Sequence, residues 1–133
     1  MRKSLATIVA AGLLAAIFSG CASVQVAHKF NGQKIDGKGS QPVAHINGSN
    51  WGFYFLSVPL IAGSTDKVGE VEFLGKDTVK VAPVVDIVTA KSAKMGATST
   101  LDLQSNTSSF MLPIPFPFLF YINSVEVSGN AVK

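Results

Sequence analysis

Apolar residues in this chain fall mostly in short runs or alternate with polar residues, which is the pattern of β-strands. The segment 51–62 (WGFYFLSVPLIA) is rich in aromatic and β-branched residues. It predicts a buried strand that Pro59 ends or places at a sheet edge. Further strands are predicted at 24–26, 43–47, 68–74, 98–103 and 121–132, and the polar segment 104–109 is predicted to be a loop.

One segment has the helical period instead. Pro83 is tolerated only in the first turn of a helix, Val84, Val88 and Met95 fall on one helical face, and Gly96 supplies a left-handed stop. The residues before it, Asp77 or Thr78, are expected to cap this helix. The expected fold is therefore α+β, a mostly antiparallel sheet with one main helix, at about 83–95, packed on it.

The first twenty residues have the pattern of a secretory signal peptide. Arg2 and Lys3 are positively charged, 5–18 is an apolar run, and Ser19 and Gly20 are small. The run is too short to cross a bilayer comfortably, because a transmembrane helix needs about 20 apolar residues. We therefore interpret residues 1–20 as a signal peptide that is cleaved from the mature protein.

Cys21 follows this segment directly, and Phe18-Ser19-Gly20-Cys21 resembles the lipobox of bacterial lipoproteins. The resemblance implies a thioether from the Cys21 thiol to diacylglycerol, cleavage just before Cys21, and acylation of the new amino group. Several acyl chains hold a protein firmly at a membrane. In the enterobacterial sorting pattern that it resembles, Ala22 implies the outer membrane, with the protein on its periplasmic side. The alternative is an ordinary secretory signal followed by an accidental cysteine.

The rest of the chain is expected to be a tether and one domain. Residues 21–40 are polar and carry the turn-forming pair Asn31-Gly32 and the glycine-bearing stretch 36–40, so they are interpreted as a tether after the lipidated cysteine. Residues 41–133 are expected to form a single α+β domain. A mature chain starting at Cys21 is long enough to bury a core without a metal or a disulfide.

Charge and cysteine content exclude several functions. The 133 residues carry a formal net charge of +3, but without residues 1–20 nine lysines oppose eight acidic residues and no arginine remains. Arginine is the preferred residue for phosphate and base recognition, so no nucleic-acid partner is expected. The single cysteine excludes an internal disulfide and a zinc site made of four cysteines.

Candidate chemistry is sparse. His28 and His45 are the two histidines, and without further soft ligands we expect ordinary surface histidines, no metal site and no cofactor. No serine lies in a G-x-S-x-G motif, and 63–65 lacks the lysine of a phosphate-binding loop. Asp86 and Asp102 could approach each other as a carboxylate pair, although solvated aspartates are the more common outcome. The chain is not expected to be an enzyme.

The unusual features are two aromatic and proline-rich segments, 51–62 and 110–122. They are expected either to pair as core strands or to form an exposed apolar edge that meets a partner protein, an apolar ligand or the lipid surface. Prolines favour the second interpretation, because they occur at sheet edges and hold an extended shape. The candidate interaction surface consists of Trp51, Phe53, Phe55, Phe116, Phe118 and Phe120.

Most of the mature chain is similar to small lipoproteins of unknown function from Gram-negative bacteria. The resemblance rests on the segments 55–60 (FLSVPL), 85–89 (VDIVT), 95–97 (MGA) and 125–129 (VEVSG). These motifs are structural, so the resemblance implies no catalytic residue. The expected function is that of a lipid-anchored, non-enzymatic binding or interaction module of the cell envelope. The alternatives are a structural or stress-related lipoprotein that self-associates and, after it, a hydrolase using Asp86 and Asp102.

Overall fold

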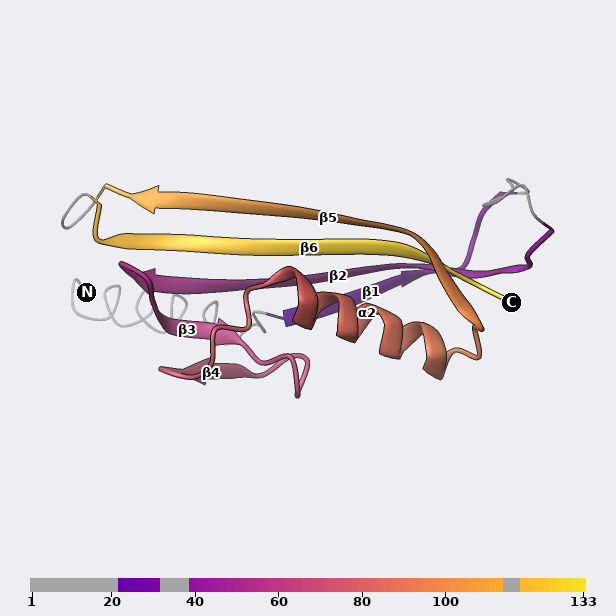
Figure 1. Cartoon of the computed structure of the whole chain (residues 1–133), viewed down its shortest axis with the longest axis horizontal. Helices are drawn as coiled ribbons and strands as arrows, with labels where there is room; N and C mark the ends of the chain where they lie inside the picture. The colour runs from indigo at the N-terminus through magenta and orange to yellow at the C-terminus, as the bar shows by residue number, and fades with distance from the viewer. Residues whose placement is uncertain (1–21, 32–38, 114–117) are drawn as a thin grey trace, which may run out of the picture.

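The computed structural model of this chain describes residues 22–31, 39–113 and 118–133. They form one antiparallel sheet of six strands with one helix packed on it (Figure 1), which confirms the predicted α+β class. In chain order the elements are β1 (Ala22–Ala27), β2 (Pro42–Phe55), β3 (Val58–Gly63), β4 (Val71–Phe73), α2 (Val81–Lys94), β5 (Ser99–Leu112) and β6 (Phe120–Val132).

Two long strands form the centre of the sheet, whose order is β4-β3-β2-β6-β5. β2 and β6 pair along their whole length, from Pro42 beside Val132 to Phe55 beside Phe120. On its other edge, β2 pairs with β1 along 45–50 and with β3 along 52–55. β1 and β3 therefore follow one another along the same edge of β2.

One face of the sheet, which we call the covered face, carries α2 (Figure 1). Alternate residues of β2 and β6 are buried on this face, as the two-residue period of a strand requires. They are Ala44, Ile46, Gly48, Asn50, Gly52, Tyr54, Val125, Val127, Gly129 and Ala131. Gly48 lets the helix approach closely, because a Cβ atom there would lie 2.6 Å from Cγ2 of Val88. The core therefore lies between α2 and the two central strands.

The opposite face, which we call the open face, has no described helix or strand packed on it (Figure 1). The intervening residues of β2, from Val43 to Phe53, are half-buried, although they lie on a central strand. β5 is the outermost strand beside β6, and nearly all of its residues are exposed on both faces. A large part of this sheet is thus left accessible to a partner.

The helix agrees closely with its predicted position. It covers Val81–Lys94, its C-terminal cap is Met95, and Gly96 has a φ of +78°. Val84, Val88 and Ser92 are buried, as the periodicity indicates. The predicted cap is wrong, because Lys80 occupies the N-cap position without a capping side chain. Asp77 and Thr78 instead bond to the sheet, as described below.

Several predicted segments differ from the structure. Residues 22–27 form β1 and pair with β2, which confirms the strand predicted at 24–26 but makes this part of the expected tether part of the sheet; the tether residues 32–38 lie outside the described part of the chain. The prediction of a loop at 104–109 is wrong, because this segment continues β5 and pairs with β6. The single strand at 51–62 is two strands, joined by a tight turn in which Leu56 has a φ of +53°. Only 71–73 of the predicted strand 68–74 is paired.

Candidate functional site

The open face has a polar half and an aromatic half, and the strand register separates them. Residues side by side on β1, β2, β6 and β5 share a row across the sheet. Two neighbouring rows are polar, namely Gln25-Asn47-Ser128-Gln104 and Ser23-Ser49-Glu126-Asn106. Beyond the row of Trp51 the side chains become apolar, in Phe53-Ile122-Phe110 and Phe55-Phe120-Leu112. Trp51 therefore marks the border between the two halves.

Three phenylalanine rings pack together in the aromatic half. The rings of Phe53 and Phe120 are stacked with centroids 5.4 Å apart and planes 3° from parallel, and Phe55 lies 5.4 Å from Phe120 at an angle of 55°. Offset stacking of this kind is favourable beyond the burial of area alone. The cluster is ordered by its own contacts, yet it remains accessible, because Phe53 and Phe120 are half-buried and Phe55 is exposed.

The same end of the sheet carries most of the exposed large apolar side chains in the described residues. We call this set the apolar tip; it consists of Phe55, Leu56, Val58, Phe73, Leu74, Phe110, Met111 and Phe118. Leu74 is 73% exposed, Phe118 65% and Phe110 62%. These residues come from the ends of β2, β3, β4 and β5 and from the turns that connect them. Contiguous apolar surface on a folded protein marks an interaction site more often than scattered exposed residues do.

The structure brings together part of the predicted interaction surface. Phe53, Phe55 and Phe120 form the ring cluster, and Trp51 borders it. Phe118 lies two residues before the start of β6 at the same end of the sheet. Phe116 and Cys21 lie outside the described residues.

Sequence reasoning included 110–122 as a candidate segment but named neither Phe110 nor Met111 of β5, and it left out Phe73 of β4 and Leu74, which follows β4. Phe73 reaches the tip because it pairs with Ile61, which pairs with Phe53. Phe110 reaches it because it pairs with Ile122. Only the register between strands places Phe73 and Phe110 on the face of the ring cluster, whereas Met111 lies at the same end of the sheet in the row of Tyr54 and Tyr121. The alternation of apolar and polar residues within 68–74 or within 110–122 does not predict that these side chains are exposed.

The aromatic segments both pair as strands and leave apolar side chains exposed on the sheet. The segments do pair as strands, since Phe53 lies beside Ile122 and Tyr54 beside Tyr121. Tyr54 points to the covered face and belongs to the core, whereas Phe53 and Phe55 point to the open face. The period of two therefore sends neighbouring aromatic residues to opposite environments.

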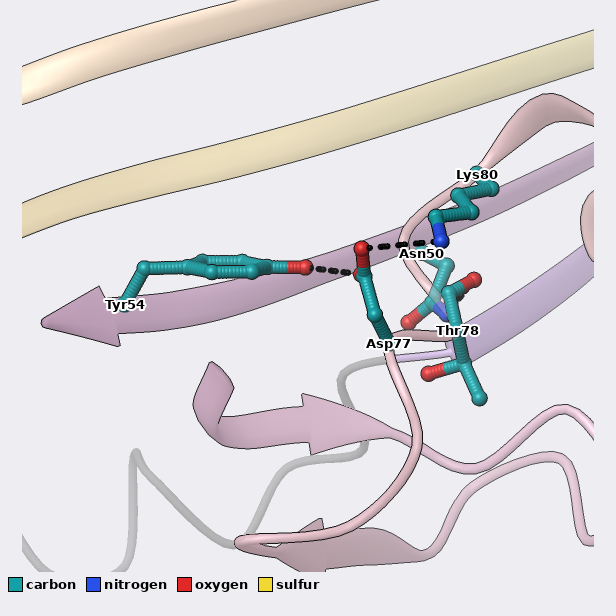
Figure 2. Close-up of polar contacts among 5 residues, drawn as sticks. All are labelled: Asn50, Tyr54, Asp77, Thr78 and Lys80. Atoms are coloured by element: carbon teal, nitrogen blue, oxygen red, sulfur yellow. Dashed lines mark hydrogen bonds and ion pairs between the residues drawn. The ribbon is translucent and has the colours of Figure 1, made fainter. Parts of the chain in front are cut away.

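A hydrogen-bonded network on the covered face fixes the segment that leads into α2 (Figure 2). The Tyr54 hydroxyl donates to Oδ1 of Asp77 at 2.5 Å, and Nζ of Lys80 lies 3.3 Å from Oδ2 of the same carboxylate. Burial, and after it the Asp77 carboxylate, raises the pKa of Tyr54 well above its usual value. This tyrosine is therefore held as a neutral hydrogen-bond donor.

Asn50 and Thr78 continue the network toward β3 (Figure 2). Nδ2 of Asn50 donates to the carbonyl oxygens of Gly63 and Thr78 at 3.1 and 3.0 Å, and the Thr78 hydroxyl donates to Gly63 at 2.7 Å. Oδ1 of Asn50 is buried without a hydrogen-bond partner among the described residues. These bonds hold 77–80 against the sheet, which orients the start of α2 beside the core.

The two aspartates proposed as a carboxylate pair are not brought together. Asp86 is exposed on α2 and lines a shallow groove with Val24 of β1. Asp102 is exposed on β5 and accepts a hydrogen bond from Nδ2 of Asn130 at 3.1 Å. β1 and β5 lie on opposite sides of the two central strands, so the carboxylates are separated across the sheet.

Both histidines form local contacts at the end of the sheet away from the apolar tip. His45 Nδ1 lies 2.8 Å from Oδ1 of Asn130, and His28 Nδ1 lies 3.4 Å from the carbonyl oxygen of Val43. Within residues 22–31, 39–113 and 118–133, no three His, Cys, Asp or Glu side chains come close enough to hold a metal ion. No helix in these ranges is long and apolar enough to span a bilayer.

Comparison with protein families, curated proteins and solved structures finds no match for this chain. The open face, the apolar tip and the motif around Cys21 are therefore the features of this chain that point to a function.

Proposed function

We propose that this chain is a lipid-anchored cell-envelope protein that acts as a non-enzymatic interaction module, with the apolar tip and the aromatic half of the open face as its binding surface. The observation that carries this proposal is the gathering of exposed apolar side chains at one end of a sheet whose other end is polar. The lipobox-like sequence ending in Cys21 supports the anchor and an outer-membrane, periplasmic location.

The energetics favour an interface at the tip. Full burial of a Phe or Leu side chain contributes about 1.5–3 kcal/mol relative to leaving it exposed. Several tip residues that are more than half exposed therefore offer a partner a favourable contact that the isolated domain does not use. The stacked rings of Phe53 and Phe120 keep this surface ordered before binding, which reduces the entropy cost of association.

A substitution experiment tests this surface. Phe110→Asp and Phe118→Asp should reduce chemical cross-linking of the anchored protein to other envelope components, while the thermal unfolding midpoint stays nearly unchanged. Leu103→Asp is the control for position, because Leu103 is 44% exposed on the same strand and lies away from the tip, beside Gly129 of the covered face. Unfolding of the domain by the Phe110 and Phe118 substitutions would instead place these side chains in the core.

Self-association is the second candidate function, and β5 supports it. β5 is a strand of 14 residues at the edge of the sheet, and 104–109 carries no charge or proline that would discourage pairing. The opposite edge consists of two shorter strands, β1 of six residues and β4 of three. An antiparallel β5–β5 contact between two copies predicts concentration-dependent sedimentation that Ser105→Lys weakens. A monomer at every concentration would exclude this function.

A further inference from the structure

The position of Ala22 limits where a lipid on Cys21 can lie. β1 runs antiparallel to β2, from Ala22 beside Asn50 to Ala27 beside His45, so Ala22 is the residue of β1 nearest the apolar tip. Cys21 is bonded to Ala22, and consecutive Cα atoms are about 3.8 Å apart. A lipid attached to Cys21 is therefore joined to the sheet at the row of Asn50, next to the border residue Trp51.

No tether separates that attachment point from the domain. Ala22 is buried and paired, and its carbonyl oxygen accepts a hydrogen bond from the Gly69 amide at 3.1 Å. The polar segment expected to hold the domain away from the membrane begins instead after β1, where it connects β1 to β2. A lipidated Cys21 must therefore keep the sheet itself at the membrane surface.

The apolar tip is within reach of the bilayer from this attachment point. Phe55 lies five residues beyond Asn50 on β2, which is about 17 Å along a strand. Strands inclined by about 30° to the membrane plane would lower the tip by about 8 Å, the depth at which apolar faces of surface-bound helices are buried. Trp51, at the border of the aromatic half, would then lie at the level of the lipid headgroups, where tryptophan is favoured.

The shape and charge of the tip suit a bilayer as its occupant. Its residues project from strand ends and turns, and the hollow at this end is lined largely by polar groups, including Tyr54, Ser57 and Asp77. The tip itself contains no charged residue. Glu72 and Lys76 flank its β4 end along the chain, with Glu72 in the row of Ala62 and Gly52 on the covered face, and the nearby Asp77 carboxylate is paired with Lys80. A fluid hydrocarbon phase accepts such exposed apolar side chains without a complementary apolar pocket.

We propose that the apolar tip and the aromatic half of the open face rest against the membrane that holds the Cys21 lipid, so that the sheet is oriented on the bilayer with its polar half facing the periplasm. This inference rests on the proposed anchor and names the lipid surface as the partner of the same site.

Fluorescence quenching in reconstituted vesicles tests the orientation. The full, lipidated protein is placed in phosphatidylcholine vesicles with or without bromine on the acyl chains. Trp51 is the one tryptophan of the chain, so Trp51→Phe gives a background for a single new tryptophan. Phe110→Trp places that tryptophan at the tip. Leu103→Trp places it on the same strand, seven residues or about 24 Å away, beyond the row of Asn50.

We expect brominated lipid to lower the fluorescence of the Phe110→Trp protein about twofold and to leave that of the Leu103→Trp protein nearly unchanged. Equal quenching of both would overturn the inclined orientation. Quenching of neither would overturn the docking and assign the tip to a protein partner or a second copy, while an intact lipid mass on Cys21 would leave the anchor standing. Absence of lipid from Cys21 would overturn both the anchor and the docking. Circular dichroism and thermal unfolding of each variant establish that the sheet is formed.

Discussion

Gly48 gives the sharpest test of how α2 packs on the sheet. It lies on the covered face of β2, and a Cβ atom built there would lie 2.6 Å from Cγ2 of Val88 and 3.3 Å from Cγ1 of Val84. Valine is branched at Cβ and has few alternative rotamers, so neither side chain can move aside easily within a packed core. Gly48→Ala should therefore push the helix away from the strand.

The size of the effect follows from two opposing contributions. Forcing one extra methyl group into a close-packed core costs about 1–3 kcal/mol, and restriction of the unfolded chain by alanine offsets about 0.4–1 kcal/mol of this. The free energy of unfolding should thus fall by about 1–2 kcal/mol. For a domain of this size the thermal midpoint should fall by about 5–15 °C.

Urea and thermal denaturation of four proteins measure this effect: the unsubstituted chain, Gly48→Ala, Val88→Ala and the double variant. Val88→Ala removes the clashing methyl group, so the double variant should be more stable than the sum of the single effects by about 1 kcal/mol or more. Gly75→Ala is the control, because its nearest atom is the flexible Glu72 carboxylate, and it should change stability by less than about 0.5 kcal/mol. Simple additivity of Gly48→Ala and Val88→Ala would refute this packing.

The remaining predictions concern the Tyr54 network and the anchor. Tyr54→Phe removes the hydrogen bond to Asp77 and should lower the free energy of unfolding by about 1–3 kcal/mol in chemical denaturation at neutral pH. Because the folded-state pKa of Tyr54 is raised above the unfolded value of about 10, the unfolded state loses this proton first. In the unsubstituted chain, the free energy of unfolding should therefore decline above about pH 10 as the contribution of Tyr54 is lost. The Tyr54→Phe variant should lack this part of the decline. Identical pH profiles of unfolding free energy for the two proteins would contradict the raised pKa of Tyr54. Cys21→Ser should leave the unprocessed precursor without lipid in the mass spectrum of the membrane fraction, and normal processing of that variant would contradict the lipobox interpretation.

The α+β class and the helix could be predicted because the relevant signals are local. Val84, Val88 and Ser92 share a helical face, and Gly96 adopts the left-handed conformation that ends a helix. The segment 104–109 shows the opposite case. Both of its faces are exposed, so it has no alternation of apolar and polar residues, and only its pairing with β6 makes it a strand.

The candidate site could be predicted in part for the same reason. The aromatic segments are conspicuous in the sequence, and Phe53, Phe55 and Phe120 do form one cluster. Phe73 and Phe110 join this end of the sheet through pairings between distant segments, which a single sequence does not contain. Polar composition favoured a tether at 22–27, but pairing with β2 draws this segment into the sheet.

Site-specific photo-cross-linking in intact cell envelopes shows directly whether the apolar tip is a binding surface. A photoreactive phenylalanine analogue is placed at Phe110, in the apolar tip, and separately at Leu103, on the same strand but away from it. If the tip is the binding surface, illumination should give abundant adducts to lipid or protein from position 110 and few from position 103. Equal yields from the two positions, or no adduct from position 110, would contradict the account.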